Sequence, residues 1–549
     1  MGAAASTGVP AVPATRAEAY AAGFKCIDVD AFEIAQRRAA APAAAPAPRK
    51  LRVVHFNDVY NLLATGDDDS CVGGAARFYT KLKEIRDSDP ANPPLVIFGG
   101  DLFGPSQVSA VTKGRHMVEM LDTLGVHYGC FGNHEFDFGL KGLEKCLNTS
   151  ISKYGITTEP SRVQWLCTNV AGADGAPLGR AQKSAVIDWN GVKVGILSVS
   201  ENWLPGCSKV KSDEYVYRDY VDAAREEAKQ LRAAGAEVVL ALTHSGIGKD
   251  REMMAQIPVE EIDLLCGGHD HDYIRDEALR IVKAGQEWRY LTDVEFSLPA
   301  EPCAPGAAAL AKCAQVNIGS DIAEDPCVAA IVEKWEGMVA LKAAKVIGQA
   351  ACALDSREEA TRWREGELSN WLCDVVAEDF SADAGSQAAD LAMLNGYALS
   401  GKQLDAAGPV TVGHLLNWFP SLVVCEVVKL TGAEILQSLE LGCEKLPGEC
   451  GPLHHVSSRV AYSIDVAQPA GKRVHSATFD GEAIDAARIF TVACTANMGN
   501  GGFGFDWMKA APRVVDEEFA TPVVELCVDW FKRHKGEAID PKLGRIIIH

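Results

Sequence analysis

Short apolar runs rich in β-branched residues recur through the first half of this chain, and their spacing is the feature that most constrains its fold. Six of them read "LRVVHF", "PLVIFGG", "VHYGCFG", "VKVGILSVS", "EVVLALTH" and "IDLLCGGHD". Each is the length of a buried strand. Helix-like segments lie between several of them, at Gly74–Arg86, Arg115–Leu124 and Val221–Ala234. Strands that alternate with helices predict a layered α/β domain.

Polar residues follow directly on these runs, where the predicted strands end. They are Asp58, Asp101, Asn133, His244 and His269. In α/β sheets ligands gather just beyond the carboxyl ends of strands, so we expect these side chains to share one edge. Any one of them alone would be an ordinary turn, cap or core residue, whereas the whole set indicates a metal site. Carboxylate, amide and imidazole donors favour Mn, Fe, Zn or Co over calcium, which prefers oxygen alone.

The length of the chain, 549 residues, predicts at least two domains, because single cores stop growing at roughly 250–300 residues. Residues 1–50 end in "RRAAAPAAAPAPRK", an Ala/Pro tract that predicts a flexible leader. We expect a first domain over residues 51–320, a linker helix over residues 321–344, and a second, smaller α/β domain over residues 345–549.

The charge and the cysteines bound the partners and the compartment. A formal net charge of -21 without a long Lys/Arg block argues against nucleic acid as a partner. A small phosphorylated substrate is compatible with this charge, because bound metal cations would reverse the local sign. The 17 cysteines contain no Cys-x-x-Cys pair, which predicts reduced thiols and a cytoplasmic location.

No membrane-spanning segment is predicted, because no apolar run approaches the ~18 residues that a spanning helix needs. The opening "MGAAAS" has two interpretations. Either Gly2 is myristoylated after removal of Met1, which would give weak membrane association, or the pattern is part of the Ala-rich leader.

These motifs resemble those of the calcineurin-like metallophosphoesterases, in the branch that contains 5′-nucleotidases and UDP-sugar hydrolases with an added C-terminal domain. The resemblance covers about residues 51–549. It implies a four-layer α/β/β/α sandwich followed by a smaller α/β domain, and a phosphoester hydrolase with two divalent or mixed-valence ions of Mn, Zn, Fe or Co. By this resemblance Asp101 would bridge the metals, Asn133, His244 and His269 would complete one site, and Asp58 and His271 would belong to the other.

The segment "CFGNHEFDFG" then divides its work between neighbouring residues. In the family the His that matches His134 faces the phosphoryl group, and an Asp three residues later, here Asp137, orients it. An imidazolium held by a carboxylate stabilises developing charge or protonates the leaving oxygen, which contributes about 10²–10⁴-fold to the rate. For Glu135 we expect a solvent-facing or capping carboxylate outside the metal set.

The first motif departs from the family pattern. Where the family has Asp-x-His, this chain has Asp58-Val59-Tyr60, which puts a phenol in place of an imidazole. Tyr60 either ligates a ferric ion as phenolate, hydrogen-bonds a bridging water or simply packs.

The second domain departs further. In "NGYALSG", Ser400 stands in place of the family's phosphate-binding Arg, and in "ANMGNGGFGFD", Asn497 stands in place of an aromatic clamp. "FPSLVV" replaces a Pro-Phe-Gly-Asn segment. We therefore expect the aromatic sandwich for a nucleobase to be absent. The candidates to line a different substrate pocket are Asn395, Tyr397, Phe503 and Phe505, with core packing of the aromatic residues the equal alternative.

The sequence therefore favours a metal-dependent phosphomonoesterase that acts on a small phosphorylated metabolite, with a 5′-nucleotidase-like organisation. The alternative is a catalytically impaired protein of the same fold that serves as a binding or scaffold protein. Tyr60 and the altered second domain support the alternative, and the number of metal ions bound per chain separates the two.

Overall fold

The computed structural model describes residues 48–66, 68–148, 161–207, 209–380, 388–399, 401–419, 422–448 and 450–549. The predicted leader, residues 1–50, and the candidate acylation site at Gly2 lie outside the described residues, except for the end of the leader, which enters the first strand. The chain divides into two compact units. Within the described residues, the first takes 48–104, 113–205 and 209–336, and the second takes 105–112, 206–207 and 337–549.

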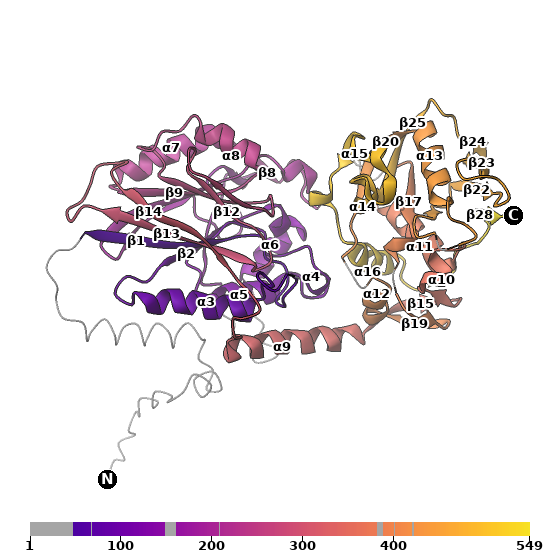
Figure 1. The fold of residues 1–549 in the computed structure, drawn as a ribbon, viewed down its shortest axis with the longest axis horizontal. Helices are drawn as coiled ribbons and strands as arrows, with labels where there is room; N and C mark the ends of the chain where they lie inside the picture. The colour runs from indigo at the N-terminus through magenta and orange to yellow at the C-terminus, as the bar shows by residue number, and fades with distance from the viewer. Residues whose placement is uncertain are drawn as a thin grey trace, which may run out of the picture. The chain divides into compact units, whose positions relative to one another are not determined.

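Two six-stranded sheets form the middle of the first unit (Figure 1). The order of the first sheet is β14 (Ala309–Asn317), β13 (Tyr290–Leu298), β1 (Arg49–Phe56), β2 (Leu95–Phe98), β3 (Tyr128–Cys130) and β4 (Gln164–Leu166). The order of the second is β11 (Tyr273–Asp276), β12 (Ile281–Ala284), β10 (Leu264–Gly268), β9 (Val238–His244), β7 (Val192–Val199) and β6 (Ser184–Trp189). All six apolar runs identified in the sequence are strands of these sheets.

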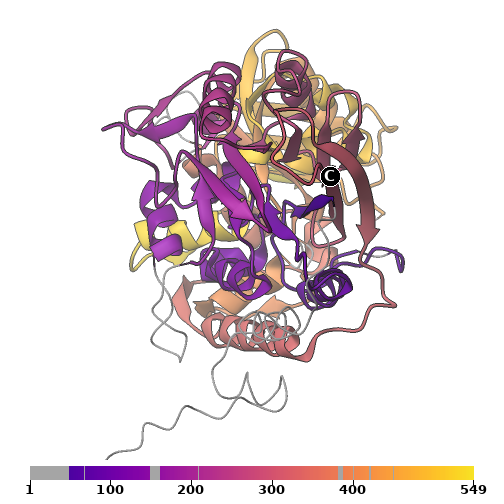
Figure 2. The same cartoon turned by 90° about the vertical axis from the view of Figure 1, so that its left-hand side faces the viewer.

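The two sheets pack face to face. One buried cluster joins Val53 of β1 and Ile97 of β2 to Val194 of β7 and Leu240 of β9. Helices cover the outer faces, with α7 (Tyr220–Ala233) and α8 (Ile247–Met254) over the second sheet. On the other side, α3 (Ala75–Ser88) packs on the first sheet, and α5 (Arg115–Leu124) lies on the same side (Figures 1 and 2). The four-layer α/β/β/α sandwich is therefore confirmed.

Local sequence explains where α7 begins. The Asp219 carboxylate accepts hydrogen bonds from the backbone N–H groups of Val221 and Asp222, each at 3.0 Å, which satisfies donors that the first helical turn leaves unpaired. The buried face of α7 carries Ala224 and Leu231 at helical spacing.

The division between the units falls within α9 (Pro326–Ala343), inside the predicted linker helix. The second unit is built on a five-stranded sheet with the order β21 (His454–Val456), β17 (Leu391–Asn395), β25 (Ile489–Thr495), β20 (Cys425–Thr431) and β26 (Arg513–Val515). A four-stranded sheet has the order β24 (Glu482–Ala483), β23 (Val474–Phe479), β22 (Val460–Ile464) and β28 (Ile546–Ile548). Among the described residues that lie wholly in the second unit, the longest helices are α11 (Glu367–Asp379), α13 (Gly432–Gly442) and α16 (Val523–Arg533).

Further strands and α-helices lie within the described residues. The strands are β5 (Val170–Gly172), β8 (Tyr215–Tyr217), β15 (Val346–Ala350), β16 (Leu354–Asp355), β18 (Leu404–Asp405), β19 (Gly408–Thr411) and β27 (Ala538–Ile539). The helices are α4 (Gln107–Thr112), α6 (Gly139–Asn148), α10 (Glu358–Thr361), α12 (Val412–Trp418), α14 (Ala496–Gly499) and α15 (Asp506–Lys509).

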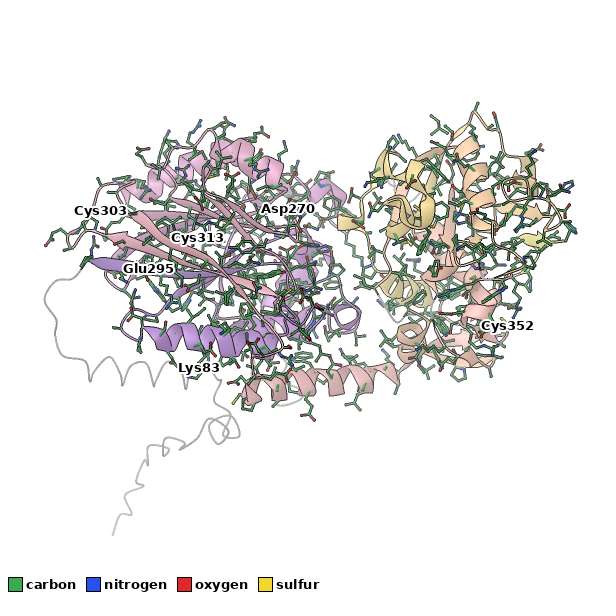
Figure 3. The ribbon with its side chains drawn as sticks, viewed as in Figure 1. Lys83, Asp270, Glu295, Cys303, Cys313 and Cys352 are labelled. Atoms are coloured by element: carbon green, nitrogen blue, oxygen red, sulfur yellow. The ribbon has the colours of Figure 1, made fainter. Side chains whose placement is uncertain are left out.

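The 16 cysteines within the described ranges are all free thiols, among them Cys303, Cys313 and Cys352, which Figure 3 labels. In the part of the chain that the structure describes, no helix combines the length and the apolar character that crossing a membrane requires.

Candidate metal centre

The predicted ligands do gather at one edge of the sandwich. Asp58, Asp101 and Asn133 follow β1, β2 and β3, which run parallel, while His244 ends β9 and His269 follows β10 in a second parallel pair. The carboxyl ends of these strands therefore lie together, as strand-end positions in the sequence predicted.

Asp101 is the residue on which most of these side chains converge. Its Oδ2 lies 3.2 Å from His244 Nε2 and 3.9 Å from His134 Nε2. Its Oδ1 accepts the backbone N–H of His134 at 3.0 Å. The Asp101 side chain is fully buried, so these contacts act in a medium of low dielectric.

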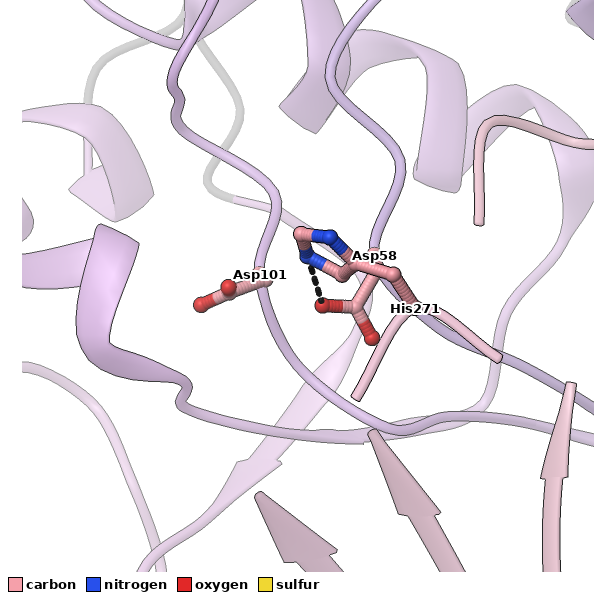
Figure 4. Close-up of side chains that lie close together, drawn as sticks. All are labelled: Asp58, Asp101 and His271. Carbon is pink, nitrogen blue, oxygen red and sulfur yellow. Dashed lines mark ion pairs between the residues drawn. The ribbon is translucent and has the colours of Figure 1, made fainter. Parts of the chain in front are cut away.

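Asp58 is the centre of a second group of contacts beside those of Asp101. Its Oδ1 lies 3.3 Å from His271 Nε2, and its Oδ2 accepts the backbone N–H of His269 at 3.0 Å. Asp58, Asp101 and His271 each present a ligand atom within 4.8 Å of the others (Figure 4). This spacing fits a single shared cation.

Tyr60 belongs to the same cluster. Its hydroxyl oxygen lies 2.9 Å from His271 Nε2, 3.0 Å from Asp58 Oδ1 and 3.2 Å from Asp101 Oδ2. These three contacts turn the phenol oxygen toward the predicted ligands. The hydroxyl instead stands where the resemblance expected an imidazole.

Two imidazoles present ring nitrogens that suit metal ligation. The Nδ1 of His244 lies 2.8 Å from the carbonyl oxygen of Gly99, and this contact assigns the proton to Nδ1. The buried Nε2 of His244 faces Asp101 Oδ2 at 3.2 Å without good hydrogen-bond geometry, and among the described residues the buried Nδ1 of His269 has no hydrogen-bond partner. Buried polar atoms without partners are rare in folded proteins, and a bound cation would satisfy both of these.

The charges at this edge also favour a cation. Burial alone would raise the pKa of Asp101, but His244 and His134 outweigh it and hold this pKa well below its usual range. Burial lowers the pKa of His244, yet Asp101 and Asp58 together raise it to about 10. Without a metal, the imidazole would keep a proton to balance the two carboxylates, and a bound metal would take the place of that proton.

The backbone of four of these predicted ligands is strained. Asp58, Asp101, His269 and His271 all have positive φ, of 53°, 66°, 84° and 61°. Such values are uncommon outside glycine and cluster at functional sites. The glycine at position 132 is required by packing, because a Cβ atom there would come within 2.0 Å of Asp101 Oδ1.

Glu135 is a capping residue, as expected, but it does not face solvent. Its carboxylate accepts the backbone N–H groups of Asp101 at 3.0 Å, Leu102 at 2.6 Å and Gly132 at 2.6 Å. The side chain is fully buried, which raises its pKa to about 7. Glu135 therefore fixes the loop that carries Asp101.

His134 and Asp137 are paired as predicted. The Nδ1 of His134 lies 3.1 Å from both carboxylate oxygens of Asp137, so the ring is held through that nitrogen and its Nε2 is directed toward Asp101. The His134 side chain is 2% exposed.

Sequence reasoning missed Lys283, whose buried side chain holds the loops that carry His244 and His269. Its Nζ donates to the carbonyl oxygens of Ser245 at 2.6 Å and Gly268 at 2.8 Å. It also forms ion pairs with Asp250, at 2.7 Å, and with Asp270, which Figure 3 labels. Ser245 follows His244 and Gly268 precedes His269. A lysine inside the buried strand "RIVKAG" was the available signal.

A pocket in the second unit contains most of the predicted substrate residues. It has a volume of about 470 Å³, and Asn395, Tyr397 and Phe503 line it. The Tyr397 and Phe503 rings stack with centroids 4.2 Å apart and planes at 17°. Ser400, Pro420 and Ser421, at which the sequence departs from the family, lie outside the described residues.

Phe505 lies elsewhere. Its side chain is fully buried in the core, where the ring packs 5.0 Å from His454 and 5.9 Å from Trp507. Phe505 does not line the pocket among the described residues, so core packing, the alternative considered for it, describes its position.

A four-layer sandwich with carboxylates and imidazoles at the carboxyl ends of its strands agrees with the metallophosphoesterase resemblance of the motifs. Residues 51–273 match the calcineurin-like phosphoesterase family, and residues 346–510 match the C-terminal domain of 5′-nucleotidases. The chain belongs to the two-domain 5′-nucleotidase family of calcineurin-like phosphoesterases, as its motifs indicated. Calcineurin-like phosphoesterases bind divalent metals, and the cluster at Asp58, Asp101 and His271 fits such an ion.

Individual relatives are distant. The chain is 23% identical to 5′-nucleotidase of Bos taurus over 502 residues, 84% of this chain and 85% of the relative. It is 25% identical to 5′-nucleotidase of Diplobatis ommata over 364 residues, 60% of this chain and 59% of the relative.

Solved structures share the fold. NAD nucleotidase of Haemophilus influenzae aligns over 91% of this chain and 100% of its own, with a TM-score of 0.71 and 16% identity. The 5′-nucleotidase precursor of Thermus thermophilus aligns over 91% of this chain and 99% of its own, with a TM-score of 0.51 and 23% identity. The chain is thus a 5′-nucleotidase-like metallophosphoesterase.

Proposed function

We propose that this protein hydrolyses a small phosphomonoester with two metal ions held at the strand-end edge of the first unit. One observation carries the proposal: the buried Asp101 carboxylate is in reach of both groups of ligands. It contacts His244 at 3.2 Å, and it lies within 4.8 Å of the ligand atoms of Asp58 and His271. A carboxylate placed in this way can serve two cations.

The ligand sets follow from these contacts. Asp58, Asp101 and His271 would hold one ion, and Asp101, Asn133, His244 and His269 would hold the other. The donor chemistry suits Mn, Zn, Fe or Co. Such a pair of ions lowers the pKa of a bound water and neutralises charge on the attacking and leaving oxygens.

The protein's own residues would then orient the ester and manage its protons. His134 is held at Nδ1 by Asp137 at 3.1 Å, so its Nε2 is the atom that would face the ester. In its protonated form this imidazole would donate a proton to the leaving oxygen, which departs as an alcohol while water supplies the new oxygen of phosphate. Glu135 and Lys283 keep the loops in place, which limits reorganisation during the reaction.

Tyr60 would complete the ligand group of Asp58 and His271. In Tyr60→His, which restores the imidazole usual in the family, we expect tighter binding of the ion at this position. Metal retention after dialysis against increasing chelator, measured beside the wild type, tests this. Weaker retention in Tyr60→His than in the wild type would show that the phenol is the better ligand in this chain.

The experiment that tests the proposed function combines metal analysis with a substrate panel. We expect two equivalents of metal per chain and phosphate release stimulated by manganese or cobalt, abolished in Asp101→Asn and cut sharply in His134→Ala. Hydrolysis that is indifferent to both substitutions would refute the proposal. One equivalent or none, with no hydrolysis, would favour the binding or scaffold protein instead.

The compartment is a separate proposal. The number and spacing of the cysteines support a cytoplasmic location, and fractionation of cells that express the full chain tests it. Substitution of Gly2 by Ala in the same experiment would reveal whether acylation holds part of the protein at a membrane.

A further inference from the structure

The predicted ligands come from two different sheets, and one short loop joins those sheets at the metal centre. Asp58, Asp101 and Asn133 follow strands of the first sheet, whereas His244 and His269 lie at strand ends of the second. Residues 285–289 connect β12 of the second sheet to β13 of the first. Because β12 runs parallel to β10, this loop begins at the edge where His269 follows β10. Its contacts therefore bear on how the two groups of ligands face each other.

The start of this loop holds the backbone on both sides of Asp58. The Oδ1 of Asn57 accepts the backbone N–H of Ala284 at 2.8 Å, and its Nδ2 donates to the carbonyl oxygen of Gly285 at 2.7 Å. The carbonyl oxygen of Asp58 itself accepts the backbone N–H of Glu287 at 2.8 Å. Asp58 is thus fixed to the loop through its own backbone and through its neighbour.

The Glu287 carboxylate holds the other end of the same segment. Its Oε1 accepts a hydrogen bond from Asn61 Nδ2 at 2.8 Å, and its Oε2 accepts the backbone N–H of Asn61 at 3.2 Å. The side chain is 8% exposed, so these hydrogen bonds to a charged acceptor are largely shielded from water. Tyr60 lies between the two fixed points, and its phenol oxygen contacts Asp58 and His271.

The loop keeps Glu287 in place against backbone strain. Glu287 and Trp288 are consecutive non-glycine residues with φ of 56° and 61°, in the left-handed region. Such conformations persist where the surroundings over-determine them. Here the Trp288 ring, 1% exposed, packs with its centroid 5.5 Å from that of Phe56 and 5.2 Å from that of Phe78. Its Nε1 donates to the carbonyl oxygen of Asn61 at 2.5 Å.

Glu287 does not belong to either predicted ligand set. Asn61 occupies both of its carboxylate oxygens, and within the described residues the cluster with metal-binding spacing is formed by Asp58, Asp101 and His271. Any effect of Glu287 on an ion must therefore pass through the segment that carries Asp58 and Tyr60. Lys283, by contrast, contacts the loops of His244 and His269.

We propose that Glu287 is a positioning residue that sets Asp58 and Tyr60 for the ion they share with His271, while Lys283 separately supports the ion at His244 and His269. The inference rests on the proposed function for the presence of two ions. It goes beyond that function by assigning each ion its own support.

Metal retention after dialysis against increasing chelator is the first test, on the manganese-loaded full chain. In Glu287→Ala we expect one equivalent to be lost at a chelator concentration about 10–100-fold lower than in the wild type, with the other equivalent kept. Glu295→Ala is the matched control, because it removes a β13 carboxylate, labelled in Figure 3, that is 26% exposed and pairs with Lys50 at 2.9 Å. Retention in Glu287→Ala equal to that in Glu295→Ala would overturn the inference.

A double variant identifies which ion is affected. Asp58→Asn removes a predicted ligand of the first ion, so we expect Glu287→Ala combined with Asp58→Asn to retain as much metal as Asp58→Asn alone. Further loss in the double variant would overturn the inference, because Glu287 would then support both ions or the fold as a whole.

A milder variant guards against misfolding of Glu287→Ala. Glu287→Gln keeps one oxygen to accept the Asn61 backbone N–H, but its amide N–H₂ would face the N–H₂ of Asn61. We expect its retention of the first ion to lie between those of the wild type and Glu287→Ala. Wild-type retention in Glu287→Gln, together with equal loss of both ions in Glu287→Ala, would mean that Glu287 serves only the fold.

Kinetics separate the failure of this inference from that of the proposed function. With excess manganese we expect kcat of Glu287→Ala to return to within about three-fold of the wild type, because the variant lacks no group that contacts the ester. A kcat that stays low with both ions bound would overturn the inference and leave the function intact. A wild type that retains both ions but releases no phosphate would refute the function and leave the retention test valid, whereas a wild type without metal would overturn both.

Discussion

The strand-end edge of the first unit and the pocket of the second differ in how much of the family pattern they keep. At the edge, every predicted ligand type except the residue at Tyr60 follows the pattern, and buried groups such as Glu135 and Lys283 brace the loops. At the pocket, the sequence departs from the family pattern at Asn497, and the rings of Tyr397 and Phe503 stack directly on each other.

The difference teaches which parts of such an enzyme can change. Buried charges at the edge depend on one another, so the loss of one leaves another without a partner at a cost of several kcal/mol. Contacts to a substrate group contribute about 1–3 kcal/mol each and can be replaced one at a time. We therefore expect the metal centre to tolerate substitution less well than the pocket does.

Asp101→Asn should have the largest effect. The amide keeps the shape but removes the charge that both ligand groups share, so we expect kcat to fall by more than about 10³-fold and metal content to drop. Phosphate release and elemental analysis measure the two. Asp276→Asn, which changes a carboxylate of β11 in the same unit that pairs with Arg251, should leave both unchanged. If Asp101→Asn retained full metal content and activity, the strand-end edge of the first unit would not be the catalytic metal centre.

His134→Ala should come next. Removing the imidazole takes away the proposed proton donor without removing a predicted ligand, so we expect kcat to fall by about 10²–10⁴-fold while metal content is kept. Asp137→Asn should give a smaller loss of about 10–100-fold, since it disturbs only the orientation of the ring. Steady-state kinetics with an alkyl phosphate, whose leaving oxygen needs a proton, measure these losses beside elemental analysis. A loss of metal in His134→Ala would instead make His134 a ligand.

Much of the fold could be predicted, because strands and helices here are encoded by local apolar patterns. The segments that became β1, β2, β9 and α5 are legible as short runs or helical spacing. Strand-end polar residues could likewise be assigned to one edge, because the carboxyl ends of parallel strands meet there.

The support of the site could not be predicted in the same way. The contacts of Lys283 with Ser245 and Gly268, and those of Glu135 with Leu102, join residues that are distant in sequence. The same holds for the stack of Tyr397 on Phe503. Periodicity carries no information about which distant residues pair, since tertiary packing decides it.

Lys283→Met should have an intermediate effect. It leaves the Asp250 and Asp270 carboxylates without their buried cation and releases the loops that carry His244 and His269. Because supporting residues typically change metal affinity by about 10–100-fold, we expect weaker metal binding and an activity that excess metal restores. Titration of activity and of metal binding with manganese measures this. Unfolding without metal is the control, because a variant that is destabilised but binds metal normally would make Lys283 merely structural.

Lys249→Met should have the smallest effect, and it isolates burial as the reason for the others. Lys249 also pairs with a carboxylate, that of Glu252 at 3.1 Å, on the helix that follows His244. Its side chain is 48% exposed, whereas that of Lys283 is 1% exposed. Water and salt already screen an exposed ion pair. Losing the lysine therefore leaves the Glu252 carboxylate in contact with water, not buried without a partner. We expect less than about a two-fold change in metal affinity and kcat under the same titration. If Lys249→Met lost as much metal affinity and kcat as Lys283→Met, positive charge near the metal centre would matter whether it is buried or exposed. The buried contacts of Lys283 would then not be what distinguishes the metal centre from the pocket.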